Sequence, residues 1–237
     1  MVQCGGMEGW NSDELEKYLR GKLRSTYTSM KGDVLRSCSL PVVMAAGSCG
    51  TLWHESCGHS LEAAAIAEGN GDFIGLIGET VASSKVTLID DGTMPGLYGS
   101  SMIDDEGHPR QRNVMIENGV LRTYLCDHLQ GKKIGMKSNG CGRRQDYTFA
   151  PTSRMSNTYL APGSDDEDEM IRSLAEGLYV KRLGVVHGLT MNGSMDDLLM
   201  NVEAVGDRLS YMPLLMHYTY QVASPAVLVK NINFAVN

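Results

Sequence analysis

The sequence has few basic residues, no long apolar run and few cysteines for its length. Its 237 residues include 21 Lys and Arg against 28 Asp and Glu, which gives a formal net charge of -7. An acidic chain is repelled by phosphate groups, so we expect neither nucleic acid nor a membrane surface as its main partner. A membrane-spanning helix needs roughly 18 to 20 apolar residues in a row, and no segment approaches that length. We therefore expect no transmembrane helix.

The scarcity of cysteine argues against a disulfide-stabilised secreted protein. Six cysteines occur among 237 residues, and we recognise no secretory segment with a charged start and an apolar core at the beginning of the sequence. We therefore expect reduced thiols and a cytoplasmic protein. A chain of this length can bury one substantial core, which predicts one or two domains.

The N-terminal third predicts a helix, a strand and a second helix. Capping residues at 11–13 precede apolar residues at helical spacing, which predicts a helix of about three turns that ends by about Lys31. Residues 40–46 form a short β-prone run, and the glycine-rich residues 47–50 close it as a turn. A helix that carries the histidine motif described below follows directly.

Glycine or Asn-Gly recurs every few residues from 71 to 124, with short β-prone runs between them at 86–89, 113–116 and 120–124. This pattern predicts an antiparallel meander made mainly of strands, with Asn118-Gly119 as a hairpin turn that needs positive φ.

The remaining third is less regular. Residues 133–161 include Ser138-Asn139-Gly140, Gly142 and Pro151, with Pro162 just after them, and predict mostly loop. The acidic run 164–169 predicts the start of a helix that continues through Leu178, because negative side chains are favoured at the positive helix start. Residues 195–209 look helical, and residues 222–229 look like a strand broken by Pro225.

The segment that carries chemistry holds two histidines and a glutamate, His54, Glu55 and His59. Neutral imidazole is a good zinc ligand, and a glutamate beside the metal can take a proton from the attacking water. In the commoner H-E-x-x-H motif the histidines are four residues apart and share one helix face, whereas here they are five apart. At about 100° per residue, a regular α-helix would separate them by about 140°.

The spacing predicts a helix that is widened by one residue. A π-type turn brings residues five apart back to one face, and Gly58 is where the distortion costs least in sterics. We therefore predict that the two histidines approach one point from a helix bulged near Gly58. On spacing alone the alternative stays open that both histidines are hydrogen-bonded core residues.

The motif and the segments after it resemble the central part of the TldD/PmbA metalloprotease family. The matching segments lie between about residues 40 and 184, and they are residues 52–62, 78–83, 90–93, 103–107, 116–121, 139–144 and 154–159. The resemblance points to the TldD branch, because the partner branch typically lacks the metal motif. This ordered set is far more specific than the histidine motif alone.

The resemblance implies a cytoplasmic zinc-dependent peptidase that acts on extended or unfolded peptides. It implies that His54 and His59 bind Zn²⁺ and that Glu55 is the catalytic base. It also implies a subunit that forms a homodimer or a heterodimer with a related family member. Together with the periodicities it predicts an α+β fold, with an antiparallel β-rich catalytic domain and a metal-motif helix. A sheet edge, which we expect in the meander, would suit extended substrates because main-chain hydrogen bonds supply affinity.

The resemblance does not extend to either end of the chain. Family members are considerably longer, and the third metal ligand of TldD-like enzymes is a cysteine near the C-terminus that nothing here matches. We therefore divide the chain into three parts. Residues 1–39 are an N-terminal helix and connector that would be a remnant of the family's N-terminal domain. Residues 40–184 are a partial metalloprotease domain, and residues 185–237 are a divergent segment, truncated relative to the family.

Two other functions stay open. The chain could be a catalytically inactive fragment, or a peptide-binding or assembly module that keeps the family scaffold, and a third metal ligand would separate these from the enzyme. A cysteine peptidase that uses Cys57 with His54 or His59 is more distant, because we interpret Cys57 as a small packing residue.

Several polar residues allow two interpretations each. Cys141 beside Arg143 and Arg144 is either a thiol of lowered pKa or a loop cysteine, and we favour the loop cysteine. The two arginines could clamp a substrate carboxylate or simply face solvent. The pair Asp104-Asp105 could bind a cation, but in a turn bounded by glycine it more often caps backbone donors.

Overall fold

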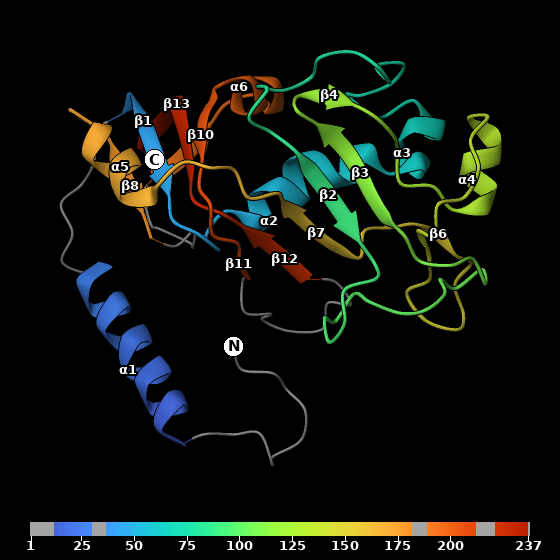
Figure 1. The fold of residues 1–237 in the computed structure, drawn as a ribbon, viewed down its shortest axis with the longest axis horizontal. Helices are drawn as coiled ribbons and strands as arrows, with labels where there is room; N and C mark the ends of the chain where they lie inside the picture. Colours follow the sequence, from blue (N-terminus) through green and yellow to red (C-terminus); the bar gives the residue numbers. More distant parts are fainter. Residues whose placement is uncertain (1–11, 30–36, 182–188, 212–220, 237) are drawn as a thin grey trace. The chain divides into compact units, whose positions relative to one another are not determined.

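The computed structural model describes residues 12–29, 37–181, 189–211 and 221–236 (Figure 1). The chain divides into two compact units. One consists of Met1–Cys38, Gly184–Asn192 and Asn233–Asn237, and the other of Ser39–Leu183 and Gly193–Ile232. The histidine motif belongs to the second unit, which holds most of the buried apolar residues of the described chain.

The first unit contains the helix α1 (Ser12–Ser29) and the strand β9 (Leu189–Asn192), which pairs antiparallel with the end of β13 (Val227–Val236). At 18 residues α1 has about five turns, so the prediction of three turns is wrong. The apolar spacing ends at Leu23, but the Arg, Ser and Thr residues after it tolerate helical backbone. The predicted cap at Asn11 and the end at Lys31 lie outside the described residues.

The first sheet of the second unit has the order β10-β13-β1-β8. Its members besides β13 are β1 (Cys38–Met44), β8 (Leu178–Val180) and β10 (Val202–Val205). β1 and β8 are parallel, while β10 and β13 are antiparallel. The helix α5 (Glu167–Ser173) packs on this sheet through Met170, which joins Val43 and Leu228 in one apolar cluster.

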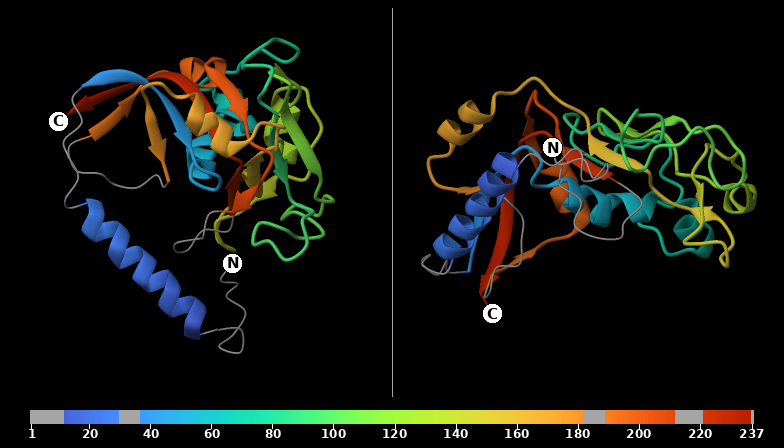
Figure 2. Two further views of the ribbon diagram at one scale, coloured as in Figure 1. Left: turned by 60° about the vertical axis from the view of Figure 1, so that its left-hand side comes forward. Right: turned by 90° about the horizontal axis from the view of Figure 1, so that it is seen from below.

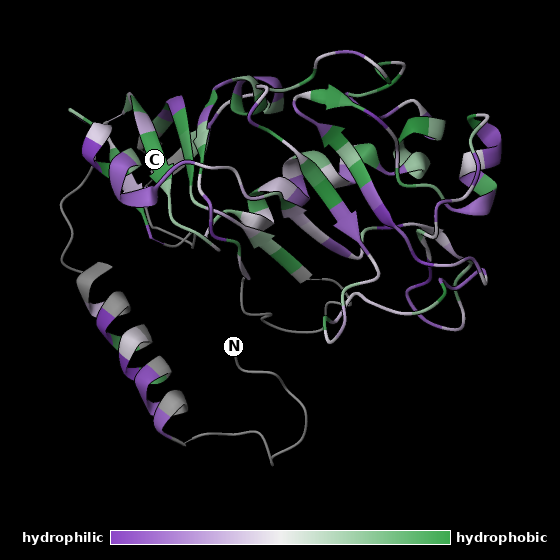
Figure 3. Ribbon diagram, in the orientation of Figure 1, coloured by the Kyte–Doolittle hydropathy of each residue, from purple (hydrophilic) through white to green (hydrophobic). Residues whose placement is uncertain are grey.

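The second sheet has the order β11-β12-β7-β2-β3-β4. These strands are β11 (Ser210–Tyr211), β12 (Gln221–Ser224), β7 (Asn157–Leu160), β2 (Leu88–Asp91), β3 (Arg112–Glu117) and β4 (Val120–Leu121). All neighbours are antiparallel except β12 and β7. The central strand β2 begins hydrophobic and ends hydrophilic, where Asp90 and Asp91 lie (Figure 3). A separate ladder pairs β5 (Gly142–Arg143) with β6 (Thr152–Ser153).

The motif segment lies against the second sheet. It runs through the short helix α2 (Gly50–Trp53), a π-helical turn (His54–Gly58), a 3₁₀ turn (His59–Leu61) and α3 (Ala63–Glu68). α2 and the π-turn contact β7, and α2 also contacts β12, as the two further views show (Figure 2). The helix α4 (His128–Lys133) comes later in the chain and contacts α3. Mixed sheets with short helices confirm the predicted α+β class, and none of the described helices is long and apolar enough to cross a membrane.

The antiparallel pairing predicted for the meander is confirmed, but the predicted share of strand residues is not. β2, β3 and β4 are consecutive antiparallel neighbours, and Asn118 and Gly119 have φ values of 49° and 83°, as the hairpin turn requires. The prediction of mainly strands is wrong, because most of residues 71–111 lie in turns, bends and irregular segments outside the strands. Their glycines are too closely spaced to leave room for ladders.

Two predictions for the last third are corrected and two are confirmed. Residues 133–161 are mostly loop, as predicted, and the strands among them include β7, a fully buried strand at the centre of the second sheet. The helix α5 ends at Ser173, and Leu178 instead begins β8, because the backbone turns extended at Leu174. The helix predicted for residues 195–209 is only α6 (Met195–Met200), followed by β10. The predicted break at Pro225 is confirmed between β12 and β13.

Gly119 gives a first test of the hairpin. A Cβ added there would lie 2.4 Å from the Ala82 carbonyl oxygen, at a φ of +83°, whereas Gly107 has nearly the same φ, +84°, and nothing within 4 Å. Gly107→Ala should therefore cost about 1 kcal/mol of unfolding free energy from backbone strain alone. Gly119→Ala should cost about 2 to 3 kcal/mol, because the clash with backbone adds to the strain. Urea unfolding of both variants measures the difference, and equal costs would contradict the close approach of the hairpin turn to the Ala82 carbonyl.

Candidate metal centre

A π-turn brings the two motif histidines together. The backbone N–H of His59 donates to the carbonyl of His54, five residues earlier, which closes the wider turn. The imidazole centroids lie 4.9 Å apart and the rings are almost perpendicular, at 80°. The bulge predicted near Gly58 is thus confirmed, and it removes the angular separation that a regular helix would impose.

Gly58 is required because another side chain occupies the space beside it. A Cβ at Gly58 would lie 2.0 Å from Sδ of Met155, a buried residue in the segment that leads into β7. Met155 therefore packs directly against the widened turn at Gly58.

The three motif side chains present their donor atoms to one region. One donor atom each from His54, Glu55 and His59 lie within 4.8 Å of one another. His54 is buried, and burial, together with the charges of His59 and Arg143, lowers its pKa to about 3. A neutral imidazole keeps a lone pair for a metal. Glu55 is half exposed, and its Oε2 lies 3.6 Å from Nε2 of His59.

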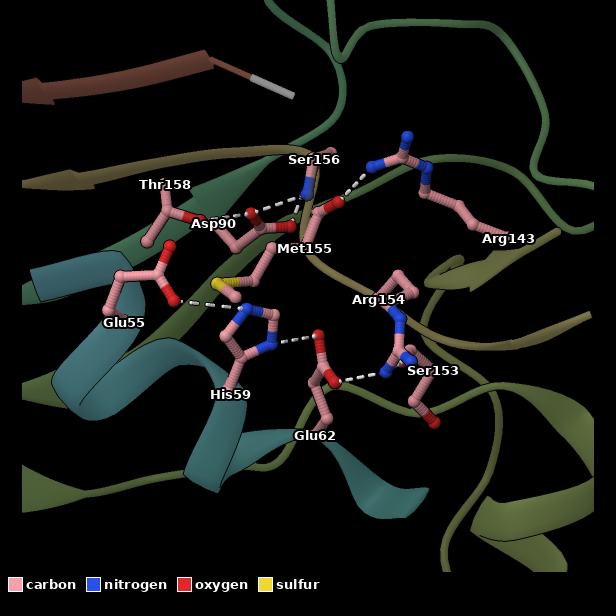
Figure 4. Close-up of polar contacts among 10 residues, drawn as sticks. All are labelled: Glu55, His59, Glu62, Asp90, Arg143, Ser153, Arg154, Met155, Ser156 and Thr158. Atoms are coloured by element: carbon pink, nitrogen blue, oxygen red, sulfur yellow. Dashed lines mark hydrogen bonds and ion pairs between the residues drawn. The ribbon is translucent and has the colours of Figure 1, made fainter. Parts of the chain in front are cut away.

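Glu62 holds the ring of His59 through its other nitrogen, Nδ1. Its Nδ1 lies 3.2 Å from Oε1 of Glu62, and this hydrogen bond, with the charges of Glu62 and Glu55, raises the pKa of His59 above its usual value. Glu62 is 3% exposed, and its second oxygen accepts from Nη1 of Arg154 at 2.5 Å. The side chains of Arg154, Glu62 and His59 form a continuous row, and Glu55 lies on the opposite side of the imidazole from Glu62 (Figure 4).

A buried carboxylate anchors the segment that carries Arg154 and Met155. Asp90 at the end of β2 accepts hydrogen bonds from the backbone N–H and the hydroxyl of Ser156 and from the hydroxyl of Thr158. Arg143 donates to the carbonyl of Met155. These contacts join β2, β5 and β7 next to the π-turn (Figure 4).

The motif alone does not indicate a role for Glu62, Asp90, Met155 or Arg154. A signal existed for Glu62, because it lies three residues after His59 and so within reach of its ring on the same turn. The other three come from segments far along the chain. Only the sheet register brings them to the motif.

Several of the remaining candidates lie elsewhere or have structural roles. Burial raises the pKa of the Cys57 thiol to about 12, which disfavours the cysteine-peptidase alternative and agrees with a packing role. Burial also raises the pKa of Cys141, so the lowered pKa considered for it is wrong. Asp104 accepts from the backbone N–H groups of Glu106, His108 and Gly142, which confirms the capping interpretation.

The donor set fits a zinc ion. Two imidazoles with a nearby carboxylate are a common set in catalytic zinc sites, where three protein ligands normally leave a position for water. Within the described ranges no further His, Cys, Asp or Glu joins the cluster of His54, Glu55 and His59. These residues could hold the metal through the two histidines, with Glu55 beside it.

Comparison with known proteins identifies the family. The family description "PmbA/TldA metallopeptidase C-terminal domain" matches residues 37–187, which is more than half of the chain. The chain belongs to this family.

Two curated relatives and one solved structure illustrate the likeness. The "Metalloprotease TldD homolog" of Buchnera aphidicola (subsp. Acyrthosiphon pisum) is 39% identical over 175 residues, which cover 71% of this chain and 36% of the relative. The "Metalloprotease TldD homolog" of Haemophilus influenzae is 41% identical over 145 residues, 61% of this chain and 30% of the relative. The crystal structure of TldE from Thermococcus kodakarensis matches with a TM-score of 0.72 and 20% identity, over 85% of this chain and 51% of that chain. The solved structure supports the fold alone.

The chain spans about a third of the length of these curated metalloprotease relatives. Membership in the TldD/PmbA family and a metallopeptidase relationship therefore rest on the matched segment, which contains the whole histidine motif.

Proposed function

We propose that this chain is the metal-binding part of a zinc-dependent peptidase that hydrolyses extended or unfolded peptides. The observation that carries the proposal is the π-turn, which gathers the donor atoms of His54, Glu55 and His59 within 4.8 Å. Such a widened turn at a five-residue spacing has no evident structural benefit and is frequent at functional sites.

In this proposal each motif residue has its own role. His54 and His59 hold Zn²⁺, which when bound polarises the scissile carbonyl and the attacking water. Glu55 is the general base, because its half-exposed carboxylate reaches solvent beside the histidines and can accept the proton of the attacking water. The proton can then pass to the leaving amine.

The substrate, the partners and the domain division are also proposals. Extended peptides suit a sheet edge. β4 is the last strand of the second sheet on the side of the meander, but its outer side is already bonded, because the backbone of Leu121 pairs with Gly78 and Glu79. A homodimer, or a heterodimer with a related family member, and a cytoplasmic location are expected from the family. We keep the division into residues 1–39, 40–184 and 185–237, in which the middle part carries the site.

Zinc binding tests the ligand assignment directly. His54→Ala and His59→Ala should each weaken zinc binding by at least about tenfold, because a site with one imidazole loses half of its nitrogen donors. Competition with a chromophoric chelator measures the dissociation constant. His108→Ala is a matched control, because His108 contacts His128 and not the motif.

Two outcomes would contradict the proposal. If both motif variants bound zinc as tightly as the unmodified chain, the histidines would not be the ligands. If zinc bound through the histidines but the longer protein that contains this chain hydrolysed no peptide, the peptide-binding or assembly module would be the better interpretation.

A further inference from the structure

The orientation of His59 depends on a carboxylate that the proposed reaction does not use. Glu62 makes two contacts with side chains, to His59 and to Arg154, and it is almost completely buried. Burial of a carboxylate is costly unless its oxygens are paired, so both contacts are needed to keep Glu62 inside the protein.

The hydrogen bond to Glu62 selects one form of the imidazole. A carboxylate can only accept, so Nδ1 of His59 must donate to it, and Nε2 is left with its lone pair. Nε2 is also the nitrogen that faces Glu55, at 3.6 Å, on the side where the motif donors gather. Glu62 therefore turns the metal-binding nitrogen toward the candidate site.

The backbone around Glu62 is fixed on both sides. Its N–H donates to the carbonyl of His59 at 3.3 Å, and the flanking residues Leu61 and Ala63 both bond to the backbone of Leu125. Glu62 itself has extended backbone between the 3₁₀ turn and α3. The carboxylate consequently has little freedom to move away from the imidazole.

Arg154 restrains the second oxygen of Glu62. Its Nη1 also donates to the carbonyl of Ser153 at 3.1 Å, and its backbone N–H donates to the carbonyl of Cys141 at 2.9 Å. The guanidinium is thus tied to the strand β6 and is not a freely moving surface group. A row of Arg154, Glu62 and His59 results, and it continues to Glu55 (Figure 4).

We propose that Glu62 is a positioning residue for metal binding, which fixes the tautomer and ring orientation of His59 and is itself held by Arg154. The inference rests on the proposed function, because it assigns His59 as a ligand. Carboxylates that hold a ligating histidine in this way typically change metal affinity by about 10- to 100-fold when they are replaced.

The test combines zinc affinity with the tautomer of the metal-free protein. Glu62→Gln should weaken zinc binding by about 10- to 100-fold, because the amide can present either an acceptor or a donor to Nδ1. Long-range ¹H–¹⁵N spectra, recorded above the pKa of the imidazole, should show His59 protonated at Nδ1 in the unmodified chain. The variant should lose this preference. A purely structural role would not alter the tautomer.

The chain offers a second variant and a matched control. Arg154→Gln should weaken zinc binding by about 2- to 5-fold, because Glu62 keeps its bond to His59 but loses its restraint. Glu117→Gln breaks a similar pair with Arg122, in which both side chains are about half exposed at 51% and 50%, and it should leave zinc binding unchanged.

The outcomes separate this inference from the proposed function. Glu62→Gln with unchanged affinity and an unchanged tautomer would overturn the inference, while loss of zinc in His54→Ala and His59→Ala would still support the ligand assignment. If circular dichroism showed that Glu62→Gln is unfolded, the zinc affinity of Arg154→Gln decides instead. An affinity of Arg154→Gln equal to that of the control Glu117→Gln would then overturn the inference. Tight zinc binding by His59→Ala would instead contradict the proposed function.

Discussion

In the longer peptidase of which we propose this chain to be the metal-binding part, Glu55→Gln is expected to keep the metal and to lower peptide hydrolysis by a factor on the order of 10² to 10⁴, the usual effect of removing a general base. The amide has nearly the same shape as the carboxylate but cannot take up a proton. Glu55 is half exposed and pairs only loosely with His59, at 3.6 Å, so the replacement should disturb the fold little. Zinc content and the rate on an unfolded protein substrate are measured on the same preparation.

The matched control for Glu55→Gln is Glu68→Gln. Glu68 is an exposed residue of α3 whose carboxylate accepts from the side-chain amide of Asn70, and its replacement should change neither zinc content nor rate. Hydrolysis retained by Glu55→Gln at the level of this control would remove Glu55 from the mechanism. Loss of zinc in Glu55→Gln would instead make the carboxylate a ligand.

The local features of the site are predictable from the sequence. The five-residue spacing of His54 and His59, with Gly58 between them, is enough to predict the π-turn, since only a widened turn can place both rings on one face. The Asn118-Gly119 turn is predictable for a similar reason, because few other residues adopt two consecutive positive φ values.

Features that depend on long-range pairing are not predictable in this way. The four residues of β7 lie between Pro151 and Pro162 in a segment whose turn residues predict loop, yet the strand is buried between β2 and β12. The row from Arg154 to His59 depends on the approach of residue 154 to residue 62, which are 92 positions apart. No periodicity in one sequence reports such a contact. The structure alone could reveal that Glu62 is paired at both oxygens.

Asp90→Ala is expected to lower the free energy of unfolding by about 3 to 5 kcal/mol. Three donors, the N–H and hydroxyl of Ser156 and the hydroxyl of Thr158, would lose their acceptor in a region where all three residues are at most 1% exposed. Each buried donor left without a partner costs about 1 to 3 kcal/mol, partly relieved where a hydroxyl can turn. Chemical unfolding measures the loss.

Asp90→Asn is the matched variant, because an amide keeps an oxygen for the Ser156 N–H and can donate to the Ser156 hydroxyl. Its unfolding free energy should lie much closer to that of the unmodified chain. A loss as large as that of Asp90→Ala would show that the charge itself, and not the set of acceptors, stabilises this region.

The stability of the unmodified chain, with Asp90, and that of Asp90→Asn should also differ in their response to pH. Burial raises the pKa of Asp90 above its ordinary value of 3.8, more than the hydrogen bonds from Ser156 and Thr158 lower it. A group whose pKa is higher in the folded than in the unfolded state stabilises the fold fully below its unfolded pKa, and this contribution is lost as the pH rises through the folded pKa. Asparagine does not titrate. The stability of Asp90→Asn relative to the unmodified chain should therefore increase as the pH is raised from about 4, and a constant or decreasing difference would show that the pKa of Asp90 is not raised.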